Sequence, residues 1–290
     1  MDREAQLAVV RAAYAKQVLA VSAVANPAVE AAFAAVRRED FLGPGPWHAF
    51  RFARGYQPTP SDDPIYLYTN DLFGIVTARG LNNGEPSLHA FLLDQSNPKP
   101  GEHAVHVGAG VGYYTAMMAH MVGPTGRVTG IEFDPELAAR ARANFTTWPN
   151  VEIVTGDGAA VPFAPADVIY VNAGATAPAQ SWLDGLKDGG RLILPLTTAQ
   201  GFGTSDFTKM ANRGGVFRIQ RQAEAYAAKW ISPVAIFPCA GNRDDAAEQE
   251  LAAAFNSRPF LDVTRLRRDP HPRDAHCWAH GEGWCLASGA

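Results

Sequence analysis

The chain has 290 residues, 47% of them hydrophobic, and a formal net charge of -4 at pH 7. This length suits one large domain or a core domain with additions. The acidic balance argues against a nucleic-acid-binding protein. No apolar run approaches the ~18 residues of a membrane span, and three cysteines argue against a disulfide framework. The N-terminus lacks the basic and apolar regions of a signal peptide, so we expect a cytoplasmic protein.

The first sixty residues predict a small helical cap. Residues 2–24 carry apolar side chains at near-helical spacing. Asn26 and Pro27 have the order of an N-cap residue followed by a first-turn proline, so a second helix is expected over residues 28–35. We expect this cap to pack beside the glycine-rich turn at residues 108–112. A plain packing appendage is the alternative.

The next forty residues connect the cap to the core. Residues 65–68 predict a short aromatic strand or extended segment, and residues 81–86 form a polar loop with strong turn chemistry. Residues 87–95 predict a helix with Leu88 and Leu92 on one face. A Pro- and Gly-rich stretch ends this helix and leads into the first core strand.

A glycine-rich turn organises the rest of the chain. An apolar stretch leads into three glycines at alternate positions, Gly108, Gly110 and Gly112, with Ala109 after the first. A helix without Pro or Gly follows over residues 115–122, so the order is strand, tight turn, helix. The free N–H groups at the helix start favour a negative group. The spacing differs from the G-x-G-x-x-G of dinucleotide sites and is usual for S-adenosylmethionine (SAM) binding; an ordinary glycine-rich turn is the alternative.

Polar residues end the strands that follow. Glu132, Asp157 with Gly158 after it, and Asn172 each lie at the carboxyl end of a predicted strand. Open α/β sheets bind ligands at the carboxyl ends of their strands, and an acid ~20 residues beyond the glycines is where ribose hydroxyls are held. A single acid at such a position is often a helix cap. Several in series with the glycine turn predict one ligand site.

Alternating strands and helices over residues 101–200 predict an α/β fold with a doubly wound, mostly parallel, Rossmann-like sheet. A turn at 188–190 precedes a strand at 191–196. The last ninety residues predict further elements: strands at 216–219, 230–237 and 260–266, a helix at 244–255 and a closing hairpin at 276–286. We predict three parts: a helical cap (1–60), a Rossmann-like core that binds SAM (61–240) and a C-terminal α+β extension packed on it (241–290).

The tail also holds several residues that can bind metals. His271, His276, Cys277, His280 and Cys285 could suggest zinc. Their spacing fits no usual zinc pattern, and a hairpin turns His276 and Cys277 to opposite faces. We therefore predict no metal site.

Several motifs in order resemble one known family. Protein-L-isoaspartate O-methyltransferases are similar to this chain at residues 36–42, 86–90, 105–137, 156–158, 167–175 and 186–195. The resemblance spans most of residues 20–240. It implies the class I SAM-dependent methyltransferase fold and SAM as the cofactor.

The resemblance also implies roles for individual residues. Gly108, Ala109 and Gly110 would pass under the methionine part of SAM, and Glu132 would hold the ribose hydroxyls. Asp157, with the Gly158 backbone, would face the adenine. The predicted cofactor set is completed by Gly112, Asn172 and His89, which matches a cofactor-contacting position in the family.

One departure affects the expected activity. The family's loop has the pattern Thr-Ile-Ser-x-Pro, in which the Ser serves catalysis, whereas here Gly84 precedes Glu85-Pro86. This puts isoaspartyl repair in doubt and leaves SAM binding intact. Transfer to a carboxylate needs positioning and no general base. Asn82 and Asn83 are therefore the candidate catalytic residues, as hydrogen-bond donors to an acceptor carboxylate; they could equally just form the loop.

We predict a SAM-dependent carboxyl O-methyltransferase whose acceptor is a carboxylate on a peptide, protein or small molecule. One alternative is an O- or N-methyltransferase of another acceptor. The other is a non-catalytic SAM-binding interaction module. Detection of methyl transfer into any acceptor pool would separate the last from the first two.

Overall fold

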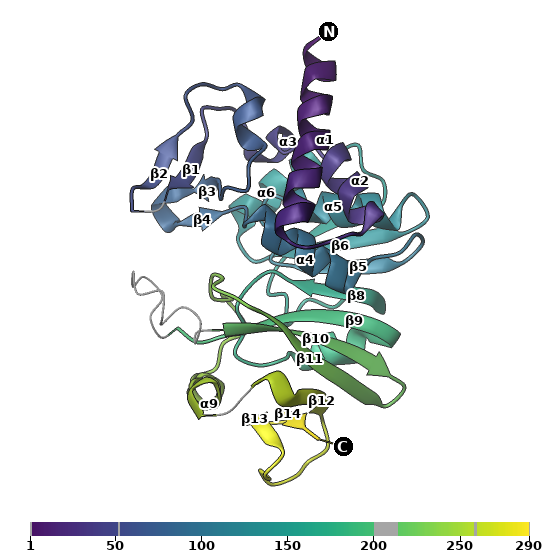
Figure 1. Ribbon diagram of the computed structural model, residues 1–290. Helices are drawn as coiled ribbons and strands as arrows, with labels where there is room; N and C mark the ends of the chain where they lie inside the picture. Colours follow the sequence, from purple (N-terminus) through teal and green to yellow (C-terminus); the bar gives the residue numbers. More distant parts are fainter. Residues whose placement is uncertain (1, 52, 200–213, 258–259, 290) are drawn as a thin grey trace. The chain divides into compact units, whose positions relative to one another are not determined.

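The computed structural model describes residues 2–51, 53–199, 214–257 and 260–289 (Figure 1). The chain forms two compact units. Unit 1 comprises Met1–Glu102, Ala109–Gly130 and Asp134–Val154, and unit 2 comprises His103–Gly108, Ile131–Phe133 and Thr155–Ala290. Within the described ranges, no helix combines the length and the hydrophobicity that crossing a membrane requires.

Unit 1 is mainly helical. Its helices are α1 (Arg3–Val21), α2 (Pro27–Ala35), α3 (Glu39–Leu42), α4 (Pro86–Ser96), α5 (Tyr113–Val122) and α6 (Pro135–Asn144). The predicted cap of the second helix is confirmed, because Asn26 Oδ1 accepts a hydrogen bond of 3.0 Å from Ala28 N. Helix α2 packs against both α1 and α5. The N-terminal helices therefore lie against the helix that follows the glycine turn.

The described residues of unit 1 also form two small hairpins and two 3-10 helices. The hairpins are β1 (His48–Arg51) with β2 (Gly55–Pro58), and β3 (Gly74–Val76) with β4 (Leu81–Asn82); the 3-10 helices are η1 (Pro64–Leu67) and η2 (Thr77–Arg79). The strand predicted at residues 65–68 is wrong. Asp63 Oδ1 accepts a hydrogen bond of 3.0 Å from Ile65 N, and Pro64 fixes the first turn, so the segment winds into η1.

Unit 2 holds most of the sheet. Its strands are β5 (His103–Val107), β8 (Ala166–Val171), β9 (Leu186–Thr197), β10 (Gly214–Gln222), β11 (Ala225–Pro233), β12 (Val263–Arg267), β13 (Cys277–Gly281) and β14 (Trp284–Ser288). Its helices are α7 (Gln180–Gly185), α9 (Asp245–Ser257) and the short η3 (Phe260–Asp262). Strands β6 (Arg127–Glu132) and β7 (Val151–Thr155) contribute residues to both units.

The sheet has ten strands in the order β13-β14-β12-β11-β10-β9-β8-β5-β6-β7. Strand β8 pairs in parallel with both β5 and β9, whereas the pairs from β9 to β13 are antiparallel. The predicted α/β class is confirmed, with an antiparallel extension that begins at the long β10–β11 hairpin (Figure 1). The strand expected at 230–237 instead begins at Ala225 and ends at Pro233.

The turn predicted at residues 188–190 lies inside β9 as an irregularity. Ala166 pairs with Leu186, but Val168 pairs with Arg191, so three extra residues bulge out of the β9 side of the ladder. Gly189 provides the left-handed backbone there, with φ of +74°.

Neighbouring strands of unit 2 share a buried hydrophobic core. Val105, Ile169, Leu192 and Phe217 are fully buried on neighbouring strands. Trp182 of α7 is also fully buried, and its indole Nε1 donates a hydrogen bond of 2.7 Å to the carbonyl of Gly158. The loop after β7 is thus held to α7 by a buried bond.

Candidate functional site

In unit 2, the loops after β5 and β8 touch each other. Gly108 N donates to Ile131 O at 2.9 Å, and Asn172 N donates to Val107 O at 2.8 Å. Gly108 has φ of +78°, and a side-chain carbon added to it would lie 3.1 Å from Asn172 O. Glycine is therefore required at 108 both for the backbone conformation and for the close approach. Gly108 and Asn172 lie side by side at adjacent strand ends.

The two acids predicted to hold the cofactor also belong to unit 2. Glu132 ends β6 and is 8% exposed, and its carbonyl accepts a hydrogen bond of 2.9 Å from Gly156 N. Asp157 follows directly, and its Oδ1 accepts a hydrogen bond of 2.9 Å from Ala159 N. A side-chain carbon on Gly158 would lie 2.3 Å from Val107 Cγ1, so this loop packs tightly on β5. The structure thus brings Glu132, Asp157 and Gly158 to neighbouring strand ends.

A segment that sequence reasoning missed reaches the same place. Residues 237–244 lie beside the loop after β8. Gly174 N donates to Phe237 O at 2.8 Å, and Cys239 N donates to Gly174 O at 2.9 Å. A side-chain carbon on Gly241 would lie 2.3 Å from Asp157 Oδ2. A side chain at position 241 would therefore require this carboxylate to move. No local motif marks Gly241, because its importance comes from a contact across 84 residues of chain.

In unit 1, the rest of the glycine turn leads into α5. Gly112 N donates to Ala109 O at 2.9 Å and closes the turn. Gly112 has φ of +98°, and a side-chain carbon there would lie 2.4 Å from Phe145 Cε2. Gly110 differs, because its φ is +57° and nothing lies within 4 Å of the position where a side-chain carbon would be. The backbone of Gly110 is therefore open to a ligand that approaches it closely.

Asn82 lies at the end of β4, where its side chain shapes the loop that follows. Its Nδ2 donates to Tyr56 Oη at 3.0 Å and to Gly80 O at 3.3 Å. Its Oδ1 accepts a hydrogen bond of 2.9 Å from Gly84 N. These contacts account for Asn82 as a loop-forming residue.

Asn83 is 6% exposed and divides its amide between two tasks. Its Oδ1 accepts hydrogen bonds from Phe73 N at 2.9 Å and from Arg38 Nη2 at 3.3 Å. Its Nδ2 is buried without a hydrogen-bond partner in the described part of the chain. One half of the amide therefore fixes the loop, and the other half is a buried donor for which the described residues offer no acceptor.

The buried side chain of Arg38 holds this loop in place through hydrogen bonds. It is completely buried, and its guanidinium donates to the carbonyls of Leu67 at 2.6 Å, Thr69 at 2.9 Å and Asp71 at 2.8 Å. Its charge also lies 4.8 Å from the centre of the Phe73 ring. The buried cation thus ties together the backbone segments that surround Asn83.

His89 and Gly84 are in close contact. His89 of α4 is 2% exposed and stacks on Tyr114 of α5, with ring centres 3.6 Å apart. Gly84 has φ of +76°, and a side-chain carbon there would lie 2.2 Å from His89 Nε2. A residue with a side chain would therefore not fit at position 84 unless the His89 ring moved.

A buried histidine lies on β5, just before the glycine turn. His106 has no exposed surface, and its ring meets Tyr170 edge-on with centres 5.4 Å apart. Burial lowers the pKa of His106 to about 3 because the charged imidazolium is poorly solvated there. The side chain is therefore neutral at physiological pH.

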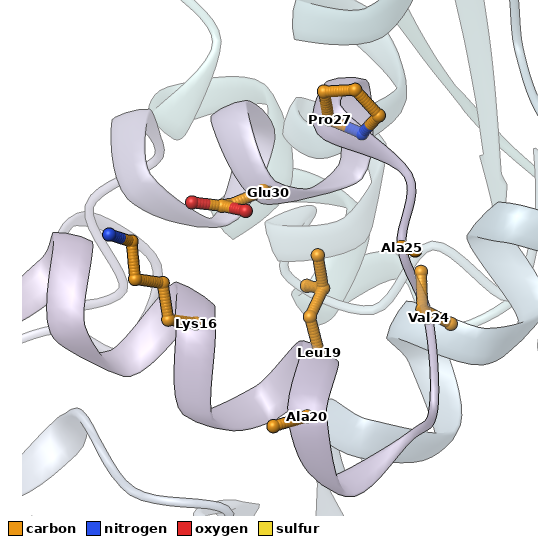
Figure 2. A pocket seen from close by; sticks show the side chains of 7 residues that line it. All are labelled: Lys16, Leu19, Ala20, Val24, Ala25, Pro27 and Glu30. Carbon is orange, nitrogen blue, oxygen red and sulfur yellow. The ribbon is translucent and has the colours of Figure 1, made fainter.

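A separate pocket of about 410 Å³ lies in the N-terminal helices and the loop between them (Figure 2). Its lining is mostly aliphatic and includes one cation, Lys16, and one anion, Glu30. It contains none of the predicted site residues.

Known proteins match much of this chain. The family profile described as "Protein-L-isoaspartate(D-aspartate) O-methyltransferase (PCMT)" matches residues 13–226. A protein-L-isoaspartate O-methyltransferase of Ignicoccus hospitalis is 34% identical over 157 residues, which are 53% of this chain and 69% of the relative. The enzyme of the same name from Methanopyrus kandleri is 40% identical over 123 residues, 41% of this chain and 54% of the relative. The match with the second relative thus spans about half of that protein.

Solved structures resemble the fold. A structure titled protein-L-isoaspartate O-methyltransferase superposes with a TM-score of 0.61 at 23% identity, covering 79% of this chain and 66% of the other. A putative protein-L-isoaspartate O-methyltransferase of Plasmodium falciparum, in complex with S-adenosyl-L-homocysteine, gives a TM-score of 0.59 at 18% identity, covering 80% and 99%. Both support the Rossmann-like methyltransferase fold.

Proposed function

Because the chain belongs to the protein-L-isoaspartate(D-aspartate) O-methyltransferase family, we propose that it binds SAM and methylates a carboxylate on a peptide, protein or small molecule. The observation that carries the proposal is the set of strand-end residues in unit 2. Two acids and two glycines follow consecutive strands there, in the order in which such sheets hold a nucleoside.

The residues present fit SAM. Gly110 leaves open space beside its backbone where any other residue would place a side chain. Glu132 and Asp157 are acceptors suited to ribose hydroxyls and to the adenine amino group, respectively. Gly108, Ala109, Gly112, Gly158, Asn172 and His89 complete the set that we propose for the cofactor. When bound, SAM supplies an activated sulfonium methyl group.

The acceptor side rests on the loop after β4. Neither Asn82 nor Asn83 can take a proton from an acceptor, so an acceptor that is already ionised suits this loop best. Asn83 Nδ2 is the buried donor that remains for such a carboxylate. We therefore assign Asn83 the orienting role and Asn82 the role of shaping the loop.

The contact between Gly84 and His89 supports an acceptor other than an ordinary isoaspartyl peptide. The site has no hydroxyl where the family has its serine, and His89 fills the space that the serine would need. Correct positioning supplies much of the rate of an in-line methyl transfer. An acceptor that needs that hydroxyl for its orientation would therefore be methylated slowly.

Two measurements test the proposal. Calorimetry should show that SAM and S-adenosylhomocysteine bind to the protein and that NAD does not. Glu132→Ala and Asp157→Ala should each weaken the binding of SAM by ~1–3 kcal/mol, which raises its Kd about 5- to 150-fold. The control is Glu152→Ala, an exposed acid on β7, which should leave Kd unchanged. NAD binding without SAM binding would refute the proposed cofactor.

The second measurement follows labelled methyl groups from SAM into candidate acceptors. Base-labile methyl esters are expected on carboxylates, with little transfer to an isoaspartyl peptide. Base-stable label would favour an oxygen or nitrogen acceptor of another kind, and no transfer into any acceptor pool would favour a binding module.

A further inference from the structure

Four metal-binding side chains of the C-terminal region converge in unit 2. The ligand atoms of His271, Cys277, His280 and Cys285 all lie within 4.8 Å of one another. They come from three places: the connection between β12 and β13, strand β13, and strand β14 (Figure 1). Both sulfurs belong to fully buried residues, and neither forms a disulfide. The family profile ends at residue 226, so the cluster lies outside the part of the chain that it matches.

A bulge in the hairpin brings these side chains to one face. Cys277 pairs with Ala287 and Ala279 pairs with Leu286, so β13 carries one extra residue at Trp278. In a regular strand Cys277 and His280 would point to opposite faces, because they are three residues apart. The extra residue restores them to the same face, where His280 pairs directly with Cys285. The four residues of the pattern His-x5-Cys-x2-His-x4-Cys can therefore converge only because of the bulge.

The distances fit a tetrahedral centre. Cys277 Sγ lies 3.6 Å from His271 Nε2 and 3.6 Å from His280 Nδ1. Zinc bonds of about 2.3 Å to sulfur and about 2.05 Å to nitrogen, set at tetrahedral angles, separate the two ligand atoms by about 3.6 Å. The two contacts thus match the edges of a zinc tetrahedron.

The surroundings prepare the ligands. His271 Nδ1 lies 2.7 Å from the carbonyl of Asp269, so this nitrogen carries the proton and Nε2 presents its lone pair to the cluster. Cys277 Sγ is held by Asp274, whose backbone N–H donates to it at 3.4 Å and whose Oδ1 lies 3.4 Å from it. Two thiolates and two neutral imidazoles around Zn²⁺ have no net charge, so the centre can be buried.

We propose that His271, Cys277, His280 and Cys285 bind one Zn²⁺ as a closed, structural site. Four protein ligands leave no open position for a reaction, and the donor set of two sulfurs and two nitrogens is typical of structural zinc. The ion would fasten the connection after β12, which contains His271, to the β13–β14 hairpin. Binding displaces one proton from each thiol.

The first test is the metal content of the purified, desalted full-length protein, measured by mass spectrometry after expression with added Zn²⁺. About one zinc per chain is expected. The double variant Cys277→Ser with Cys285→Ser should fall to nearly none. The matched controls are Cys239→Ser and His276→Ala, a third thiol and a neighbouring imidazole outside the cluster, which should keep the full content. Zinc that is absent from the unmodified protein, or that persists in the double variant, would overturn the proposal.

Two further measurements need no variant. Chelation should lower the Tm of the unmodified protein, and Zn²⁺ should restore it while Mg²⁺ should not. Thiol titration of unreduced, unfolded protein with chelator present should find all three cysteines. A count of one would mean a disulfide between Cys277 and Cys285 and would contradict the zinc site, as would a Tm insensitive to chelation.

Discussion

In the loop before helix α4, the His89 ring occupies the space that a side chain at position 84 would need. The imidazole Nε2 lies 2.2 Å from where the side-chain carbon of residue 84 would be, and the imidazole is itself stacked on Tyr114. A side chain at position 84 would therefore require this buried imidazole to move.

Gly84→Ser should lower stability and should not create efficient isoaspartyl methylation. The substitution combines a left-handed backbone with a clash against a buried ring, so we expect a loss of ~2–4 kcal/mol in the free energy of unfolding. Gly43→Ser is the control, because its φ of +73° is similar and nothing lies within 4 Å. Chemical denaturation should show a clearly smaller loss for the control. Equal losses would mean that His89 moves aside at no cost.

Two substitutions of Asn83 separate its structural role from its proposed catalytic role. Asn83→Ala removes the acceptor used by Phe73 N and Arg38, so the free energy of unfolding should fall by ~1–3 kcal/mol. Asn83→Asp keeps that acceptor beside a buried cation and removes only the Nδ2 donor. Its stability should stay close to that of the unmodified protein, while kcat falls and the Kd of SAM is unchanged. Full activity in Asn83→Asp would show that the donor is not used.

Gly241→Ala should weaken SAM binding from a position in the C-terminal part of the chain. The added carbon would lie 2.3–2.5 Å from the carboxyl atoms of Asp157 and would displace them. We expect a rise in Kd of about tenfold, similar to the loss of a hydrogen bond. Gly189→Ala is the control, because nothing lies within 4 Å of its position. An unchanged Kd in calorimetry would argue that Asp157 does not contact the cofactor.

Acid should destabilise the protein through His106. Its pKa is about 3 in the folded protein, whereas an unfolded histidine titrates near pH ~6.5. Below that value only the unfolded state takes up the proton. The free energy of unfolding therefore decreases as the pH is lowered, down to about pH 3. The contribution is about 2 kcal/mol between pH 7 and pH 5. Denaturation of His106→Leu should be less sensitive to pH over this range, whereas the exposed control His48→Gln should match the unmodified protein.

Local signals in the sequence were enough to predict the α/β class, the glycine turn and the strand-end acids. Asn26 as a helix cap and the polar residues after β6, β7 and β8 depend on interactions within a few positions, which a pattern can reveal. Residues 65–68 misled because aromatic side chains favour strands, yet Asp63 and Pro64 together start a helical turn.

The contacts that define the site's details were out of reach of a pattern. Gly241 meets Asp157, and His89 fills the space above Gly84, only after distant segments have folded together. The face shared by Cys277 and His280 depends on a single bulge at Trp278, which shifts every later side chain of the strand by one position. A spacing rule applied to a regular hairpin therefore separates residues that the structure joins.

The segment at residues 237–244 limits how the chain could be shortened. Arg243 donates to the carbonyls of Gly174 and Thr197 at 2.8 and 3.2 Å, and Asp244 N donates to Thr176 Oγ1 at 2.9 Å. Cutting the chain where the family profile ends, at residue 226, would remove the donors that these acceptors receive from Arg243 and Asp244. A minimal catalytic fragment of this protein must therefore be designed to retain these residues, and a chimaera that exchanges the C-terminal region has to carry its own replacement for Arg243.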